Sequence, residues 1–111
     1  MKYGEIWSVV YLAAIGREYQ KDRPVLIIES NNHLKITNVI TLVPLTSKIK
    51  NKHEDDILIR PDNTNGLRCD CLIKPHHISS FDGSRFIKKI GEADEEIMKK
   101  IKEYLKKHFG L

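Results

Sequence analysis

The sequence lacks any apolar stretch long enough to cross a membrane. Its longest run without a charged residue, residues 36–47, is interrupted by Thr, Asn and Pro. That run falls well short of the ~20 apolar residues that a spanning helix needs. The first seven residues, Met1 to Trp7, contain no apolar segment typical of a secretory signal. We therefore expect no signal peptide and no membrane association.

Cysteine is scarce, with two residues in a chain of 111. Two cysteines cannot crosslink a scaffold of this size, which predicts a reducing compartment, and we expect the cytoplasm. Six glycines and four prolines are ordinary usage and exclude a collagen-like or low-complexity chain. The length supports one domain, which we place over residues 1–111.

What the chain does contain is a mild excess of positive charge. Nineteen Lys and Arg residues face 15 Asp and Glu residues, which gives a net charge of +4. The excess is spread along the chain, so it does not by itself indicate nucleic-acid binding and equally fits a slightly basic surface. It does favour the approach of a polyanionic partner.

Alternating and β-branched apolar residues dominate the first two thirds of the chain and predict short strands. The predicted turns are Asn31-Asn32, residues 61–66 and residues 81–84, and the predicted loops are residues 12–22 and 46–55. The expected strands cover residues 5–11, 24–29, 34–45, 56–60, 67–74 and 85–90.

The last segment has a helical period instead. Asp94 suits an N-cap, and the apolar residues Ile97, Ile101, Leu105 and Phe109 recur at a spacing of four. Gly110 is a natural residue to end the helix. Five or six short strands with one terminal helix predict a mainly β fold, a small and strongly curved barrel with the helix packed against it.

Polar residues gather in the loop before the second strand, and Arg23 stands directly before that strand. Strand pairing would hold the Arg23 backbone while its guanidinium stays at the rim, which suits a fork of donors aimed at a phosphate. A solvated hairpin loop with a Glu18–Arg23 ion pair is the alternative.

A second polar group, Thr46, Ser47 and Lys48, ends the third predicted strand. Hydroxyls at a strand end can bind a phosphate oxygen, and they can equally cap a turn.

Cys69 and Cys71 lie near His76 and His77, but their spacing lacks the usual pattern of a zinc site. Cysteines two apart on a strand point to one face, so we expect two half-buried residues on the inner face of the barrel without a disulfide. Either histidine could titrate near neutral pH and move a proton, or lie exposed at a strand end.

Taken together, six blocks of the sequence resemble the MazF/PemK family of toxin endoribonucleases from type II toxin–antitoxin modules. The blocks occur in the family's order and cover nearly the whole chain; they are residues 4–7 (GEIW), Gly16-x-Glu18 with residues 23–28 (RPVLII), 43–47 (VPLTS), 65–67 (NGL), 77–82 (HISSFD) and 84–91. The late block departs from the family's common pattern, because His77 replaces a glutamine and Ser79 replaces an arginine.

The resemblance implies an SH3-like barrel of the CcdB/MazF type, a homodimer, and cleavage of single-stranded RNA without a metal ion or other cofactor. Carried over by position, Arg23 and Thr46 form the catalytic pair. Because arginine is a poor base at neutral pH, Glu18 or one of the two histidines is the candidate proton acceptor. The residues expected to contact RNA are Arg17, Gln20, Lys21, Ser47, Lys48, Lys74, His76 and His77.

The resemblance further implies an acidic, partly disordered antitoxin segment that covers the basic groove. Two alternatives stay open. One is a gyrase poison of the CcdB type, which shares the fold and ends much as Phe109-Gly110-Leu111 does here. The other is a family member that binds its antitoxin but no longer cuts RNA, since the basic residue expected at Ser79 is missing.

Overall fold

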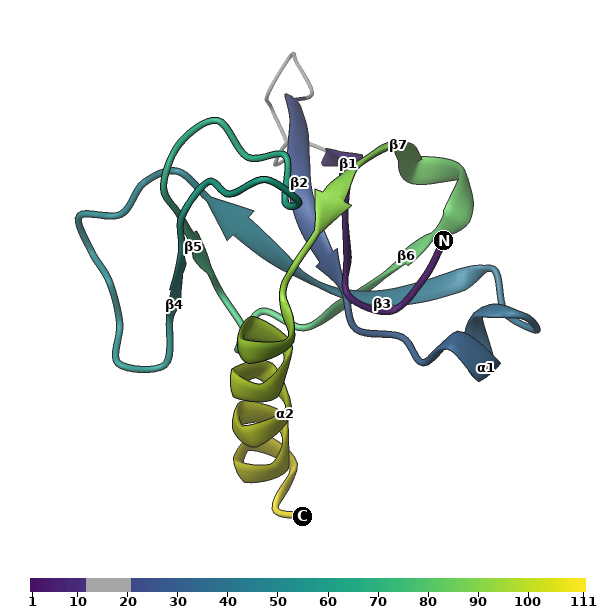
Figure 1. Ribbon diagram of the computed structural model, residues 1–111. Helices are drawn as coiled ribbons and strands as arrows, with labels where there is room; N and C mark the ends of the chain where they lie inside the picture. Colours follow the sequence, from purple (N-terminus) through teal and green to yellow (C-terminus); the bar gives the residue numbers. More distant parts are fainter. Residues whose placement is uncertain (12–20) are drawn as a thin grey trace, which may run out of the picture.

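A computed structural model describes residues 1–11 and 21–111 of the chain. Within these residues the chain forms seven strands, two α-helices and one short 3-10 helix (Figure 1). The strands are β1 (Glu5–Tyr11), β2 (Lys21–Ile27), β3 (Val39–Thr46), β4 (Ile57–Ile59), β5 (Cys71–Ile73), β6 (Ser79–Asp82) and β7 (Phe86–Glu92). The helices are α1 (Asn31–Leu34), η1 (Gly83–Arg85) and α2 (Glu95–Phe109).

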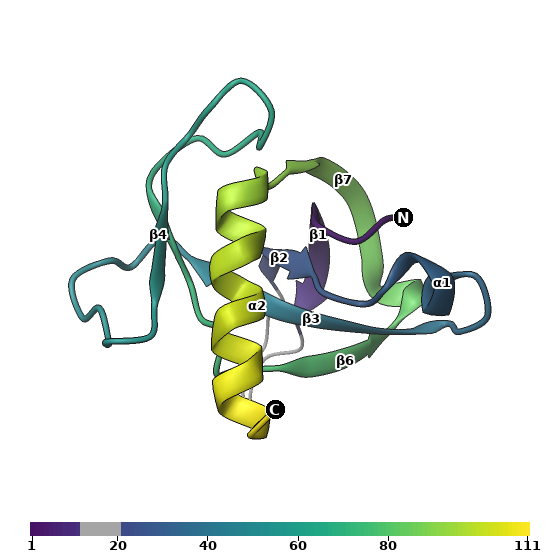
Figure 2. The ribbon, with the colours of Figure 1, turned by 60° about the horizontal axis from the view of Figure 1, so that its bottom comes forward.

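The strands form one antiparallel sheet in the order β4-β5-β3-β2-β1-β7, and β6 pairs with the first half of β3. Because β3 pairs with β5 at one end and with β6 at the other, the sheet curves strongly. In Figure 2, strands β7, β1, β2, β3 and β6 follow one another around a ring, and α2 crosses beside it. This arrangement confirms the predicted mainly β fold with a C-terminal helix.

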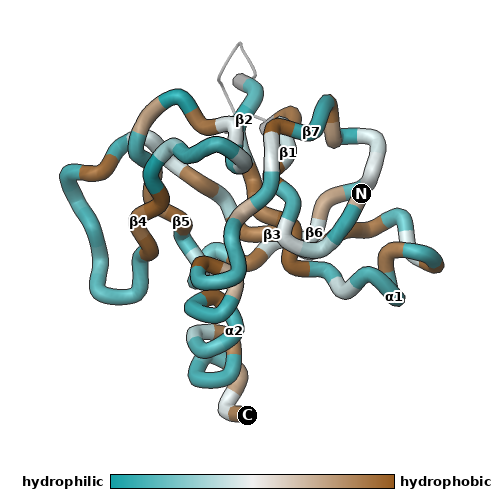
Figure 3. Tube along the Cα trace, viewed as in Figure 1, coloured by the Kyte–Doolittle hydropathy of each residue, from teal (hydrophilic) through white to brown (hydrophobic). Residues whose placement is uncertain are grey.

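The central strands bury both of their faces. One core contains Ile6, Leu26 and Val43 and packs against the buried side of α2. A smaller core on the other face contains Val9, Val25 and Leu42, with Trp7 and two phenylalanines packed on it. The strands therefore read as continuous apolar runs, and Figure 3 shows this contrast between apolar strands and polar loops.

The predicted terminal helix is confirmed at both ends. The Asp94 side chain accepts a hydrogen bond from the Ile97 backbone N–H at 2.8 Å. Gly110 ends α2 in the left-handed conformation, with a φ of 68°. Ile97, Met98 and Ile101 are the buried residues of α2. No helix in the described ranges is long and apolar enough to span a membrane.

Some predicted boundaries were wrong. The predicted turn at Asn31-Asn32 is the start of α1, because the Ser30 side chain accepts a hydrogen bond from the His33 N–H and caps a helical turn. That turn delays the third strand to Val39. Residues 81–82, predicted as part of a turn, belong to β6, whose residues are half-buried or exposed and which forms by pairing with β3.

Candidate active site

A pocket of about 910 Å³ opens where β1, β2, β3 and β7 meet the segment before β5. Five of its lining residues are cationic, whereas Asp22 is the single acidic residue among them. The cationic residues are Arg23, Lys48, Arg68, Lys88 and Lys89. Such an excess of positive charge in a concave surface attracts a polyanion.

Strand pairing places two of the predicted site residues together. Val25 of β2 pairs with Pro44 of β3, and because the strands are antiparallel, Arg23 (two residues before Val25) lies opposite Thr46 (two residues after Pro44). Side chains two residues apart on a strand share a face, so Arg23 and Thr46 point to the same side of the sheet. Both residues line the pocket. The Arg23 side chain is exposed, while its backbone pairs with that of Val9 in β1.

The end of β3 supplies hydroxyl groups to the same pocket. The Thr46 Oγ1 accepts a hydrogen bond from the Lys48 N–H at 3.2 Å, which leaves the hydroxyl hydrogen available to a ligand. Ser47 and Lys48 are exposed and line the pocket too. The predicted turn cap at Thr46 is therefore confirmed, while its role as a phosphate ligand stays a prediction.

Three other predicted residues, Lys74, His76 and His77, form a separate group beside Asp56. The Lys74 Nζ lies 2.5 Å from Oδ2 of Asp56, and only 17% of the Lys74 side chain is exposed. The His76 ring lies beside that of His77, with centroids 4.2 Å apart. Lys74 and the two histidines do not line the cationic pocket, and their contact with RNA stays a prediction.

The structure does not describe the side chains of four predicted residues. Arg17, Glu18 and Gln20 lie outside the described residues. Lys21 pairs through its backbone with Tyr11, while its side chain is not described. The roles expected for all four stay predictions.

The two cysteines differ from each other more than their spacing predicts. Cys71 is buried in the larger core, whereas Cys69 is exposed and precedes the strand, so the prediction of two half-buried neighbours was wrong. Both are free thiols, and burial raises the pKa of Cys71 to about 11. Among the described residues, no group of three or more His, Cys, Asp and Glu side chains is placed to hold a metal ion.

Comparison with known proteins connects this geometry to a family. The model of the PemK-like, MazF-like toxins of type II toxin–antitoxin systems matches residues 2–109. The chain belongs to this family. This match confirms the resemblance seen in the sequence blocks. MazF-type toxins are endoribonucleases.

Relatives of this MazF-like chain agree in sequence and in fold. Endoribonuclease MazF9 of Mycobacterium tuberculosis is 32% identical over 117 residues, covering 100% of this chain and 98% of the relative. A MazE–MazF structure from Deinococcus radiodurans matches with a TM-score of 0.82 at 19% identity, over 100% of this chain and 96% of the other. A mycobacterial endoribonuclease in complex with its cognate antitoxin matches with a TM-score of 0.74 at 19% identity, over 100% and 94%.

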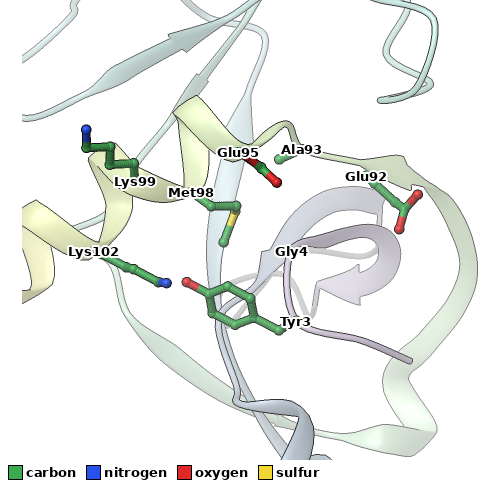
Figure 4. Close-up of a pocket in the computed structure, with 8 residues that line it drawn as sticks. All are labelled: Tyr3, Gly4, Glu92, Ala93, Glu95, Met98, Lys99 and Lys102. Atoms are coloured by element: carbon green, nitrogen blue, oxygen red, sulfur yellow. The ribbon is translucent and has the colours of Figure 1, made fainter.

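This MazF-like chain also has a second pocket, of about 530 Å³, between its N-terminal segment and α2 (Figure 4). Tyr3 and Met98 form its apolar part, and the Tyr3 hydroxyl points toward Lys102. Two lysines and two glutamates balance its charge; they are Lys99, Lys102, Glu92 and Glu95. The balanced charge makes this pocket less suited to a polyanion than the cationic pocket.

Sequence reasoning missed three cations of the cationic pocket, namely Arg68, Lys88 and Lys89. Lys88 and Lys89 are adjacent on β7 and pair with Ser8 and Trp7 of β1. The signal was the Lys-Lys pair set between the apolar residues Phe86, Ile87 and Ile90. Only the pairing of β7 with β1 shows that it reaches the same pocket as Arg23.

Proposed function

We propose that this MazF-like chain is the toxin of a type II toxin–antitoxin module and cleaves single-stranded RNA by attack of a ribose 2′-hydroxyl on the adjacent phosphate, without a metal ion. The observation that carries the proposal is the pocket that Arg23 and Thr46 line together with an excess of cations. The family membership and the 32% identity to an endoribonuclease support it.

The residues of the pocket match the demands of this reaction. RNA supplies its own nucleophile, so the protein has to stabilise the charge that builds on the phosphorus and move two protons. The exposed Arg23 guanidinium offers a planar fork of donors to two phosphate oxygens. The Thr46 hydroxyl donates to a further oxygen of the same phosphate, and neighbouring lysines neutralise the flanking phosphates.

The partners follow from the same electrostatics. An acidic antitoxin segment would place its carboxylates against the cations that otherwise hold RNA phosphates, and so block the pocket. We also propose that the toxin acts in the cytoplasm, where messenger RNA is translated, and as a homodimer. Large apolar side chains remain exposed for such an interface, among them Val39 at 51% and Ile87 at 46%.

The test uses an unstructured RNA in excess EDTA. We expect cleavage with a 5′-hydroxyl on one product and a 2′,3′-cyclic phosphate or 3′-phosphate on the other. A single deoxynucleotide 5′ of the cut should abolish cleavage, while deoxynucleotides elsewhere are tolerated. Cleavage at the deoxy position, or a strict need for a divalent ion, would refute the mechanism.

A parallel assay of gyrase supercoiling separates the alternatives. Inhibition of gyrase without RNA cleavage would identify a poison of the CcdB type. Binding to an acidic antitoxin peptide without either activity would identify a degenerate toxin. Size-exclusion chromatography with light scattering tests the dimer.

A further inference from the structure

Asp56 is a buried carboxylate that the reaction outlined above leaves unused. It directly precedes β4, and its side chain has 0% exposure. One carboxylate oxygen, Oδ2, accepts hydrogen bonds from the His53 backbone N–H at 2.9 Å and from the Lys74 Nζ at 2.5 Å. The other oxygen, Oδ1, is buried without a hydrogen-bond partner among the described residues. A buried acceptor without a partner is destabilising, which points to a role other than stability.

The group nearest to this free oxygen is the imidazole of His76. The Nδ1 of His76 lies 3.8 Å from Oδ1 of Asp56, which is within ion-pair range but too long for a hydrogen bond. The His76 ring also packs edge-on against His77, with centroids 4.2 Å apart, and against His53, with centroids 6.1 Å apart. With Nδ1 facing Asp56 and 34% of the side chain exposed, Nε2 is the nitrogen left for a ligand.

The surroundings of His76 favour its neutral form near neutral pH. Burial lowers the pKa of His76 below 6.5, and the neighbouring His77, Lys74 and His53 lower it further, while Asp56 acts in the opposite direction. A neutral imidazole with a carboxylate at Nδ1 carries its proton on that nitrogen and presents Nε2 as the acceptor. This is the tautomer that a general base needs.

The Asp56 cluster lies on the sheet face that carries Thr46. Thr46 pairs with Leu72 of β5, and Lys74 is two residues further along, so the two side chains share a face. The Lys74 N–H donates to the Pro44 carbonyl at 2.9 Å, which continues the β3–β5 pairing. The His77 N–H then donates to the Lys74 carbonyl at 3.1 Å and closes the turn that holds His76.

We propose that Asp56 is a positioning residue for RNA cleavage, and that it orients His76 so that Nε2 accepts the proton of the attacking 2′-hydroxyl. In this step the O2′–H bond breaks and its proton moves to Nε2, while the O2′–P bond forms. The P–O5′ bond then breaks, the 5′ oxygen takes a proton from water, and the hydroxide that remains takes the proton from Nε2, which restores the neutral imidazole. While Nε2 holds that proton, the imidazolium is stabilised by its ion pair with the Asp56 carboxylate, in which Nδ1 lies 3.8 Å from Oδ1. The inference rests on the proposed RNA cleavage.

The experiment compares kcat, KM and pH profiles of the wild type, Asp56→Asn, His76→Ala and the double variant. Asp56→Asn keeps the size of the side chain and removes its charge. We expect kcat to fall by roughly 10²-fold, the size typical of general-base catalysis, with KM little changed. The acid limb of kcat/KM should move to lower pH in Asp56→Asn and disappear in His76→Ala. The double variant should be no slower than His76→Ala, because Asp56 acts only through His76 and both changes impair the same proton acceptor.

Glu29→Gln is the matched control. Glu29 is another largely buried carboxylate, hydrogen-bonded to the His33 ring and to the Thr41 N–H at 2.8 Å, and it lies near α1 rather than β4. Glu29→Gln should keep the wild-type kcat and acid limb, even where its melting temperature falls. That result separates loss of stability from loss of the proton acceptor.

Three results would overturn the inference. A folded Asp56→Asn protein with wild-type kcat and acid limb would do so while leaving RNA cleavage intact. Additive losses in the double variant would assign Asp56 a structural role only. If Asp56→Asn does not fold, an unchanged acid limb in His76→Ala decides against the proposal. A wild-type protein that cleaves no RNA would refute the proposed function as well.

Discussion

The Lys89 ammonium lies 3.0 Å from Oε2 of Glu5, at the edge of the cationic pocket. The other carboxylate oxygen of Glu5 accepts hydrogen bonds from the Trp7 indole N–H and from the Lys2 N–H, both at 2.9 Å. Burial raises the pKa of Glu5, but these three hydrogen bonds outweigh it and hold the pKa below its usual value. Glu5 in turn raises the pKa of Lys89, so both groups stay charged at neutral pH.

The first prediction is that Lys89→Met weakens RNA binding through the loss of one phosphate contact. The slope of log K against log salt concentration should become shallower by ~0.7, the value for one phosphate of a single strand. Lys99→Met, which removes a lysine from the second pocket, should leave the slope unchanged. Equal slopes for the two variants would show that Lys89 does not contact RNA.

The second prediction concerns Arg23. Because Arg23 is exposed and its backbone is held by strand pairing, Arg23→Ala should fold normally and lose ~10²–10³-fold in kcat, as on removal of an oxyanion-hole donor. Arg60→Ala is the control, since the Arg60 side chain is 74% exposed and its ion pair with Asp70 is a long one of 4.0 Å at the surface. Circular dichroism checks the fold, and full activity of Arg23→Ala would disprove the assigned site.

The third prediction is a difference in reactivity between the two thiols. At pH 8, iodoacetamide should modify the exposed Cys69 and leave Cys71 unmodified, because burial raises the pKa of Cys71 to about 11 and blocks access. Mass spectrometry of peptides from the native protein should find one alkylated cysteine, and two after denaturation. Rapid labelling of native Cys71 would contradict the structure. RNA should slow the labelling of Cys69, because Cys69 lines the cationic pocket.

A fourth prediction compares two glycines that both have a positive φ. A Cβ at Gly66 (φ +70°) would lie 2.1 Å from the Ile90 carbonyl oxygen, whereas a Cβ at Gly110 (φ +68°) would meet nothing within 4 Å. Gly110→Ala should therefore show only the left-handed strain, about 1–2 kcal/mol. Gly66→Ala adds a backbone clash and should destabilise more. Urea unfolding of the two variants measures the difference, and equal losses would disprove the close approach to β7.

The fifth prediction follows from the lowered pKa of Glu5. A carboxyl group whose pKa is lower in the folded state stabilises the protein above its unfolded pKa and loses that contribution as the pH falls through the folded pKa. The difference in unfolding free energy between the wild type and Glu5→Gln should be constant above about pH 5.5 and shrink below about pH 4. A difference that grows on acidification would reverse the sign of the shift.

Local pattern was sufficient where neighbouring residues decide the structure. The alternation over Glu5–Tyr11 predicted β1 with its observed ends, and Asp94 and Gly110 marked the ends of α2. Pattern failed at β6, whose Ser-Ser-Phe-Asp sequence has little strand preference and which forms through its pairing with the distant strand β3. It failed again at α1, where the Ser30 side chain caps a helical turn at the residues predicted to form a turn.

For the site, the sequence by itself pointed to Arg23 and Thr46, because both stand in blocks that resemble those of the family. The structure places Arg23 within β2 and Thr46 at the end of β3, and their catalytic role stays a prediction. Only the tertiary structure brought Lys89 to Glu5 and His76 to Asp56, since these partners lie on different elements and no periodicity links them. Their pKa shifts follow from burial and from contacts with charged partners, and both arise when the strands pair. The local pattern of apolar residues therefore determined where most strands form, whereas the charge environment of the site arose only from the pairing of those strands.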